Sequence, residues 1–148
     1  MTEEDIPRIC EILYASYRWL AEREGFSPDE LKGLIETRGS EETVRNESKS
    51  ELYLVACKNR TIAGMVSVKE NEITKLYVDP AHFREGIGAA LFCAAEKHIA
   101  ANKYSEMTLV AIGETPVPFY EAMGMSVIGY KKDHSGRKVA IMKKTCNG

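Results

Sequence analysis

The segment LYVDPAHFREGIGAAL, residues 76–91, decides the fold class of this 148-residue chain. The alternating apolar residues 73–78 predict a strand that ends before Pro80, and an Ala- and Leu-rich helix is predicted after a short loop. The first backbone N–H groups of a helix have no internal partner and lie at the positive end of its dipole. Because Gly86 and Gly88 let the backbone come close, this helix N-terminus is suited to a phosphate group.

The spacing of the two glycines excludes two better-known phosphate loops. A dinucleotide-binding fingerprint requires a third small residue at the position of Leu91, and a P-loop requires Gly-Lys-Ser or Gly-Lys-Thr, which this segment lacks. A pyrophosphate loop of another kind remains, and Arg84 would add a fixed positive fork to it.

A second informative segment reads TPVPFYEAMGM, residues 115–125. Thr115 is predicted to cap a short helix, two prolines fall in its first turn where a missing N–H costs little, and Gly124 ends it. The segment therefore presents Phe119 and Tyr120 on a helix with defined ends.

Together the two segments resemble the motifs of the GNAT acetyltransferases. In that family a strand ending near Val-x-Pro precedes the motif Gln/Arg-x-x-Gly-x-Gly/Ala, and residues 83–88 match both glycines with Phe83 at the Gln/Arg position. Phe119-Tyr120-x-x-x-Gly124 is similar to the family motif that packs near the thiol end of coenzyme A, although the usual upstream Asn is not evident. The two segments also follow each other in the family's order.

The resemblance implies one GNAT domain over residues 1–148, of the mixed α/β (α+β) class, with a central, mostly antiparallel sheet, one parallel βαβ unit and flanking helices. It implies acetyl-CoA as co-substrate without a metal, and direct transfer of the acetyl group to a primary amine of a small molecule or peptide. The residues that would contact the cofactor are Leu76, Tyr77, Val78, Phe83, Arg84, Glu85, Gly86, Ile87, Gly88, Ala89 and Phe119.

Acetyl transfer requires three kinds of chemical group. An amine must lose a proton before it attacks a thioester, the oxyanion needs hydrogen-bond donors, and the departing thiolate benefits from an acid. By resemblance, Glu72 is the base, a backbone N–H near Tyr77 or Val78 stabilises the oxyanion, and Tyr120 is the acid. An ordinary phenol pKa near 10 matches a thiolate, so activity should decline at high pH as the phenol ionises. Glu70 and His134 are weaker candidates for the base.

Each of these assignments has a structural alternative. Glu72 is equally well explained as a surface glutamate at the end of a hairpin. Packing alone would also explain Tyr120, although the catalytic role is favoured, while His98 is expected to be a helix-end histidine rather than a base. For the whole protein, the alternatives are a catalytically weak CoA-binding regulatory or sensor domain and a structural protein on the same fold.

Candidates for shaping the acceptor pocket come from the two N-terminal helices, which in the family lie over that pocket. Packing alone would also explain the aromatic side chains among them. The candidates are Tyr14, Tyr17, Arg18, Trp19 and Phe26.

The predicted elements follow the family's order with one difference. Most family members place a short strand before the first helix, and here the sequence begins with the helix, so either that strand is missing or the chain is shortened, and one strand fewer is expected. Residues 39–50 are polar and predict a loop or an exposed helical turn. Helices are predicted over 2–24, 28–37 and 87–102, and strands over 52–57, 62–68, 73–78, 107–112, 126–132 and 137–143, the last two joined by a turn at 133–136.

Composition argues against several classes of partner. Lys and Arg number 20 against 22 Asp and Glu, a net charge of −2, so neither nucleic acid nor an anionic membrane is indicated. The N-terminus is acidic, and no apolar run reaches the ~20 residues that span a bilayer. Four cysteines without Cys-x-x-Cys spacing favour a reducing, cytoplasmic location. The sequence does not decide between a monomer and a homodimer.

Overall fold

Six strands form one central sheet in this computed structural model, which describes residues 1–133 and 135–146. They are β1 (Leu52–Lys58), β2 (Thr61–Lys69), β3 (Glu72–Val78), β4 (Glu106–Ala111), β5 (Ser126–Lys132) and β6 (Lys138–Thr145), in the spatial order β1-β2-β3-β4-β6-β5. All neighbouring strands are antiparallel except β3 and β4, which run parallel and are connected through α4 (Ile87–Ala101).

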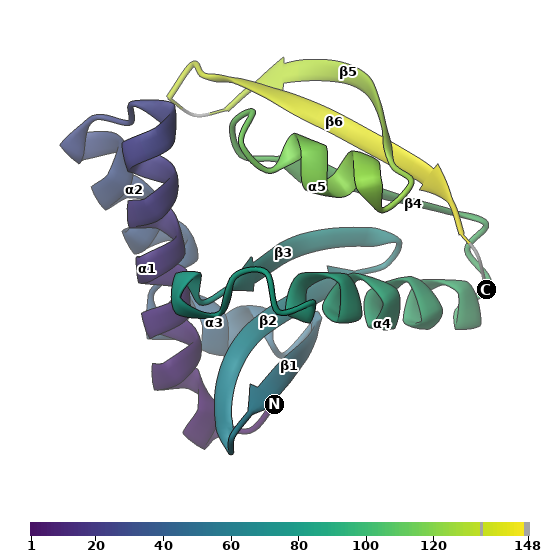
Figure 1. Ribbon diagram of the computed structural model, residues 1–148, viewed down its shortest axis with the longest axis horizontal. Coiled ribbons are helices and arrows are strands. Elements are labelled where there is room, and N and C mark those ends of the chain that lie inside the picture. Colours follow the sequence, from purple (N-terminus) through teal and green to yellow (C-terminus); the bar gives the residue numbers. More distant parts are fainter. Residues whose placement is uncertain (134, 147–148) are drawn as a thin grey trace.

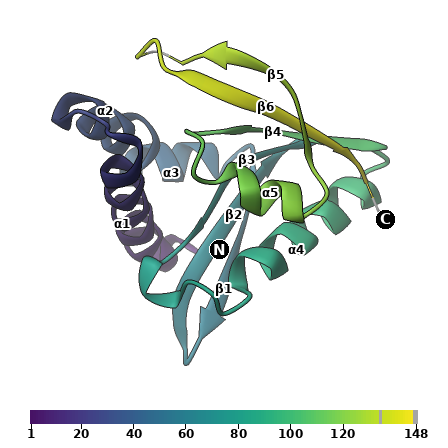
Figure 2. The ribbon, with the colours of Figure 1, turned by 45° about the horizontal axis from the view of Figure 1, so that its top comes forward.

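Helices pack on the sheet to form two hydrophobic cores (Figures 1 and 2). One core joins α4 and the short α5 (Val117–Ala122) to the sheet around Phe92, and the other joins α1 (Ile6–Glu24), α2 (Pro28–Arg38) and α3 (Glu41–Glu47) to β1–β3. Alternate residues of β2 supply both cores, because Val66 belongs to the first and Met65 to the second. No helix in the described part of the chain has the length and apolar character needed to cross a bilayer.

The parallel contact between β3 and β4 is short. It consists of the pairs Glu72–Thr108 and Ile73–Leu109. On the other side of β3 the register shifts at the same point, because Val68 pairs with Ile73 whereas Ser67 pairs with Lys75.

Thr74 is therefore the extra residue of a β-bulge in β3. A bulge bends its strand and increases the local twist, so β3 turns away from β4 after Ile73. Figure 1 shows the result: the half formed by β5, β6 and α5 lies apart from the half formed by β1–β3 and α4. We call the opening between β3 and β4 the wedge.

The predicted fold class is confirmed. The sheet is mostly antiparallel, with one parallel pair inside a βαβ unit and helices around it. As expected, no strand precedes α1 among the residues that the structure describes. The turn predicted at 133–136 and the weak base candidate there involve His134, which lies outside the described residues.

Residues 39–50 were predicted as a loop or an exposed helical turn, and the structure has a helix there, α3, with one buried side chain that the prediction did not include. Ser40 caps α3 by accepting a hydrogen bond from the Thr43 amide (3.1 Å), and Val44 is fully buried in the core that includes residues of α1, β1 and β2. A single apolar residue in a polar stretch produces no readable periodicity, so the helix is defined by its cap and by one long-range contact.

The prediction that Thr115 caps α5 was wrong. The helix begins at Val117 after Pro116, and Thr115 instead directs its amide (2.8 Å) and its hydroxyl to the Glu24 carboxylate at the end of α1. The neighbouring amide of Glu114 donates to the same carboxylate (3.1 Å). Glu24 therefore ties α1 to the segment that follows β4.

Candidate active site

A cavity of about 540 Å3 lies in the wedge. We call it the first cavity. Its floor is β3, and its other walls come from the end of β4, the start of α4, helix α5 and one face of α1. The predicted cofactor contacts that line it are Leu76, Tyr77, Val78, Phe83, Arg84, Gly86, Ile87, Gly88, Ala89 and Phe119. The structure thus brings together residues from both sequence motifs.

The start of α4 forms an anion-binding end of the first cavity. Gly86 is the N-cap in a left-handed conformation (φ +80°), and the first internal hydrogen bond runs from the Ala90 amide to the Gly86 carbonyl (3.1 Å). The amides of residues 87–89 precede that bond and have no acceptor within the helix. A Cβ atom at Gly86 would meet no protein atom within 4 Å, so the backbone there is open to a ligand.

Gly88 was expected to let the backbone approach a phosphate, and the structure gives a second reason for a glycine at this position. A Cβ atom at this position would lie 3.2 Å from the Phe119 ring, closer than most real contacts of a Cβ. The absent side chain therefore lets α5 pack against the first turn of α4. A substitution here would displace Phe119 as well as any bound anion.

The loop before α4 is held by Asp79. One carboxylate oxygen accepts from the Ala81 amide (3.0 Å) and the other accepts from the Arg8 guanidinium (2.7 Å). Partial burial favours the neutral acid, but these two donors outweigh it and hold the pKa of the Asp79 carboxyl below its ordinary value. The loop is thereby fixed to α1.

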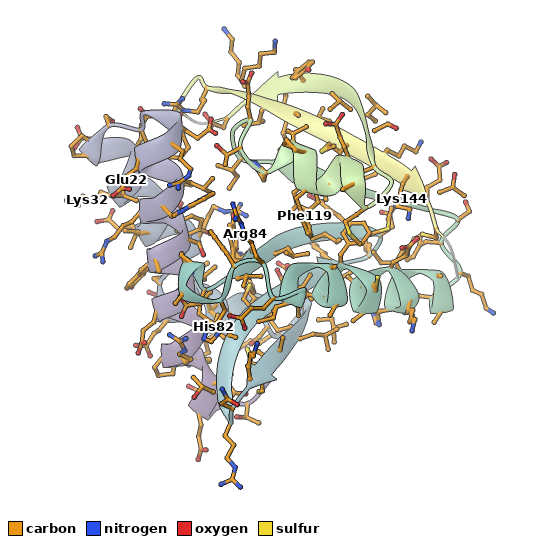
Figure 3. All side chains as sticks on the ribbon, in the orientation of Figure 1. Glu22, Lys32, His82, Arg84, Phe119 and Lys144 are labelled. Atoms are coloured by element: carbon orange, nitrogen blue, oxygen red, sulfur yellow. The ribbon has the colours of Figure 1, made fainter. Side chains whose placement is uncertain are left out.

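Three loop residues direct their side chains differently. Arg84 adopts a left-handed backbone (φ 66°) and points into the opening between α1 and α5 (Figure 3). Phe83 packs edge-to-face against Trp19 of α1, with ring centroids 5.0 Å apart. The Glu85 carboxylate pairs with Lys58 and with His82, and among the predicted contacts in this loop it is the one that does not line the first cavity.

Tyr120 lies at the α5 wall of the first cavity and is 8% exposed. Its ring packs against those of Phe119 (centroids 5.2 Å apart) and Phe92 (6.4 Å). Burial, with a smaller contribution from Tyr77, raises the pKa of Tyr120 well above the ordinary value near 10. No described residue forms a hydrogen bond with its hydroxyl, so this neutral acid is available to a ligand.

A second cavity of about 740 Å3 lies on the other side of the wedge, between α2, β3, β4 and the β5–β6 hairpin. Glu72 lines this second cavity and not the first, so the two predicted catalytic residues lie in different cavities. The cavities share a wall made of Arg38, Ile73, Thr74, Val110 and Ile112. Sequence reasoning did not find this arrangement, because it depends on the divergence of β3 and β4.

The candidates for the acceptor pocket are divided between several environments. Trp19 lines the first cavity and Phe26 the second. Tyr17 is fully buried against Tyr77, Tyr14 packs in the core beside it, and Arg18 is exposed.

The base candidate Glu70, and His98, which was expected to be a helix-end residue, lie away from both cavities. Glu70 is exposed in the turn between β2 and β3, with φ 55°. His98 is in the last turn of α4, beside Asn102.

The acetyltransferase (GNAT) domain family matches residues 22–146 of the chain. A structure titled GCN5-related N-acetyltransferase, aminotransferase class II, from Rhodopseudomonas palustris has a TM-score of 0.89 and 21% identity, covering 98% of this chain and 92% of that chain. The PaiA N-acetyltransferase from Thermoplasma acidophilum, in complex with coenzyme A, has a TM-score of 0.80 and 24% identity, covering 98% and 95%. An aminoglycoside 6'-N-acetyltransferase complexed with coenzyme A has a TM-score of 0.66 and 16% identity, covering 96% and 93%. At these identities the structures establish the shared fold.

Replacing Asp79 by Asn should lower the free energy of unfolding by about 1–3 kcal/mol at neutral pH, because two hydrogen bonds lose their ionic acceptor. The folded-state pKa is depressed, so the carboxylate contributes fully above its ordinary pKa and loses that contribution as the pH falls through the depressed pKa. Urea denaturation of parent and variant should therefore show a clear difference at neutral pH that shrinks in acid.

Glu22→Gln provides the matched control, since Glu22 is exposed on the outer side of α1 (Figure 3). It should leave the stability unchanged. Equal stability of the parent and Asp79→Asn at neutral pH would contradict the assigned role of Asp79.

Proposed function

Because the chain belongs to the GNAT acetyltransferase family, we propose that it transfers the acetyl group of acetyl-CoA directly to a primary amine of a small molecule or peptide. One observation carries the proposal: two cavities meet at a shared wall on β3 and β4. A donor in the first cavity and an acceptor in the second would approach each other there without crossing the sheet. Direct transfer requires such a meeting point.

The first cavity suits two parts of coenzyme A, the pyrophosphate and the pantetheine arm. The unpaired amides at the start of α4 and the Arg84 guanidinium would hold the pyrophosphate. Beyond Thr74, whose carbonyl accepts from Arg38, the edge of β3 has no β4 partner, so its N–H and C=O groups there could bond the amides of a pantetheine arm as an added strand would. A thioester bound in this way would lie near Tyr120.

Glu72 is the proposed acceptor of the ammonium proton, directly or through water. Three other carboxylates line the second cavity, and each is engaged: Glu30 pairs with Arg137, Glu47 pairs with Lys75, and Asp133 bonds within its own turn. Glu72 has neither an ion pair nor a side-chain hydrogen bond to a described residue. It is therefore free to take up a proton.

Tyr120 is the proposed acid for the leaving thiolate. Burial raises its pKa, so the phenol stays protonated across the whole pH range of an ordinary assay and would act on the departing sulfur as a positioned hydrogen-bond donor, without the pKa match of an ordinary phenol. The decline at high pH that an ordinary phenol would cause is therefore no longer expected.

The compartment is part of the same proposal. All four cysteines are free thiols, which supports a reducing environment. We place the protein in the cytoplasm.

Thiol release from acetyl-CoA, measured with a panel of amines, tests the proposed activity. The parent should release thiol only when a suitable amine is present. Binding of acetyl-CoA without release for any amine would instead favour a regulatory CoA-binding domain.

Gly86→Val should weaken acetyl-CoA binding at least about tenfold in calorimetry, because a branched side chain would occupy the site of the pyrophosphate.

Gly25→Val is the matched control for this binding experiment. Gly25 also has a positive φ (69°) and open space around it, but it lies at the end of α1 and lines neither cavity. It reproduces the backbone strain without the expected loss of affinity. Equal affinities of the parent and Gly86→Val would rule out the phosphate site.

Glu72→Gln keeps the shape of the side chain and removes the basic carboxylate. The rate at neutral pH should fall by about two to four orders of magnitude, with acetyl-CoA affinity unchanged. Glu70→Gln, in the adjacent turn outside both cavities, should retain full activity. A rate within about threefold of the parent for Glu72→Gln would make Glu72 a surface glutamate and assign proton removal to water or to His134.

Tyr120→Phe keeps the ring and its packing and deletes the hydroxyl. Turnover should fall by about two orders of magnitude or more while acetyl-CoA affinity is retained. Because the parent phenol stays protonated, parent and variant should have parallel pH profiles on the alkaline side. Full activity of the variant would make Tyr120 a packing aromatic, and an alkaline limb present in the parent alone would contradict the raised pKa.

A further inference from the structure

Three buried side-chain polar atoms in the described chain have no hydrogen-bond partner: Ser16 Oγ, Tyr17 OH and Arg38 Nε. All three belong to α1 and α2, and Ser16 and Arg38 line the first cavity. The great majority of buried polar groups are partnered, so each exception needs an explanation. Their concentration at one wall indicates that a ligand completes it.

Arg38 is the charged member of this group. At the end of α2, its Nη2 donates to the carbonyl of Thr74 (2.9 Å), the bulge residue whose strand has turned away from β4. The Tyr17 hydroxyl lies close to the guanidinium and interacts with it, but Arg38 Nε itself has no hydrogen-bond partner. A guanidinium keeps its proton and offers only donors, so the partner it lacks is an oxygen, best an anionic one.

The position of Arg38 indicates that the oxygen it lacks as a hydrogen-bond partner belongs to the substrate that accepts the acetyl group. Arg38 belongs to the wall shared by the two cavities, where acetyl group and acceptor amine would meet. The pyrophosphate of coenzyme A is assigned to the start of α4, so the donor's charge is already accommodated elsewhere.

The balance of unpaired charge in the second cavity favours the same conclusion. Arg137 is neutralised by Glu30 at 2.8 Å, and the other engaged acids, Glu47 and Asp133, have partners of their own. Three cations remain without an ion pair to a described residue, against Glu72 as the one unengaged carboxylate. These cations are Arg38, Lys131 and Lys132.

We propose that the acceptor is a small amine that also carries a carboxylate, with the carboxylate on Arg38 and the amine on the Glu72 side of the second cavity. This inference rests on the proposed function and narrows its acceptor. An acceptor with several ammonium groups and no anion would bring a positive charge to Arg38, where no unengaged acid compensates it.

Matched pairs of acceptors test the inference on the unaltered protein. Each pair consists of an amino acid and its decarboxylated amine, for example lysine with cadaverine and tyrosine with tyramine, and the amino acid amide separates charge from size. We expect kcat/KM to be at least about tenfold higher for the carboxylate member, as for a charge-assisted hydrogen bond. Equal values within the pairs, or a preference for the diamine, would overturn the inference while leaving the proposed function standing.

Arg38→Gln should then reduce the preference for the carboxylate member to near one, with acetyl-CoA affinity unchanged in calorimetry. Lys32→Gln is the control, because Lys32 is exposed on the same helix and points away from both cavities (Figure 3). A preference that survives Arg38→Gln would overturn the role of Arg38. If Arg38→Gln fails to fold, the comparison of acceptor pairs with the parent protein still decides the acceptor class. If the parent releases no thiol with any of the acceptors, both the proposed function and this inference are overturned.

Discussion

The β-bulge at Thr74 is the feature on which the rest of the site depends. It ends the parallel pairing after Ile73 and turns β3 away from β4, so that both cavities open along one strand edge. An unpaired strand edge inside a protein is costly, because each buried N–H or C=O group needs a partner. Arg38 satisfies the Thr74 carbonyl, and the edge beyond it is left for a ligand.

A sheet that diverges at its centre must be held together by contacts outside the sheet. The N-terminal helices provide them. Glu24 at the end of α1 accepts the amides of Glu114 and Thr115 after β4, and Glu30 of α2 pairs with Arg137 before β6. These polar contacts close the far ends of the wedge and leave its centre open. The helices thus have a structural role in addition to forming the cavity walls.

How much could be predicted from the sequence depends on the range of each signal. The loop before α4 and the end of α5 at Gly124 could be predicted, since glycines, prolines and alternating apolar residues act locally. The bulge is a register shift between two strands, and Thr74 itself carries no mark of it. Arg38 and the wall shared by the cavities were missed for the same reason, because residues distant in sequence meet only after β3 and β4 diverge.

The two sides of the wedge differ in a way that bears on how specificity could change. The first cavity surrounds Tyr120 with aromatic and aliphatic groups, and that burial keeps its phenol neutral. Charged side chains that do not line the first cavity, including Glu72, Lys131 and Lys132, line the second cavity. Since α2 and the β5–β6 hairpin contribute to the second cavity, their residues could be exchanged without altering the start of α4. Acceptor choice can therefore vary on a constant donor site, because the bulge separates the two functions along one strand.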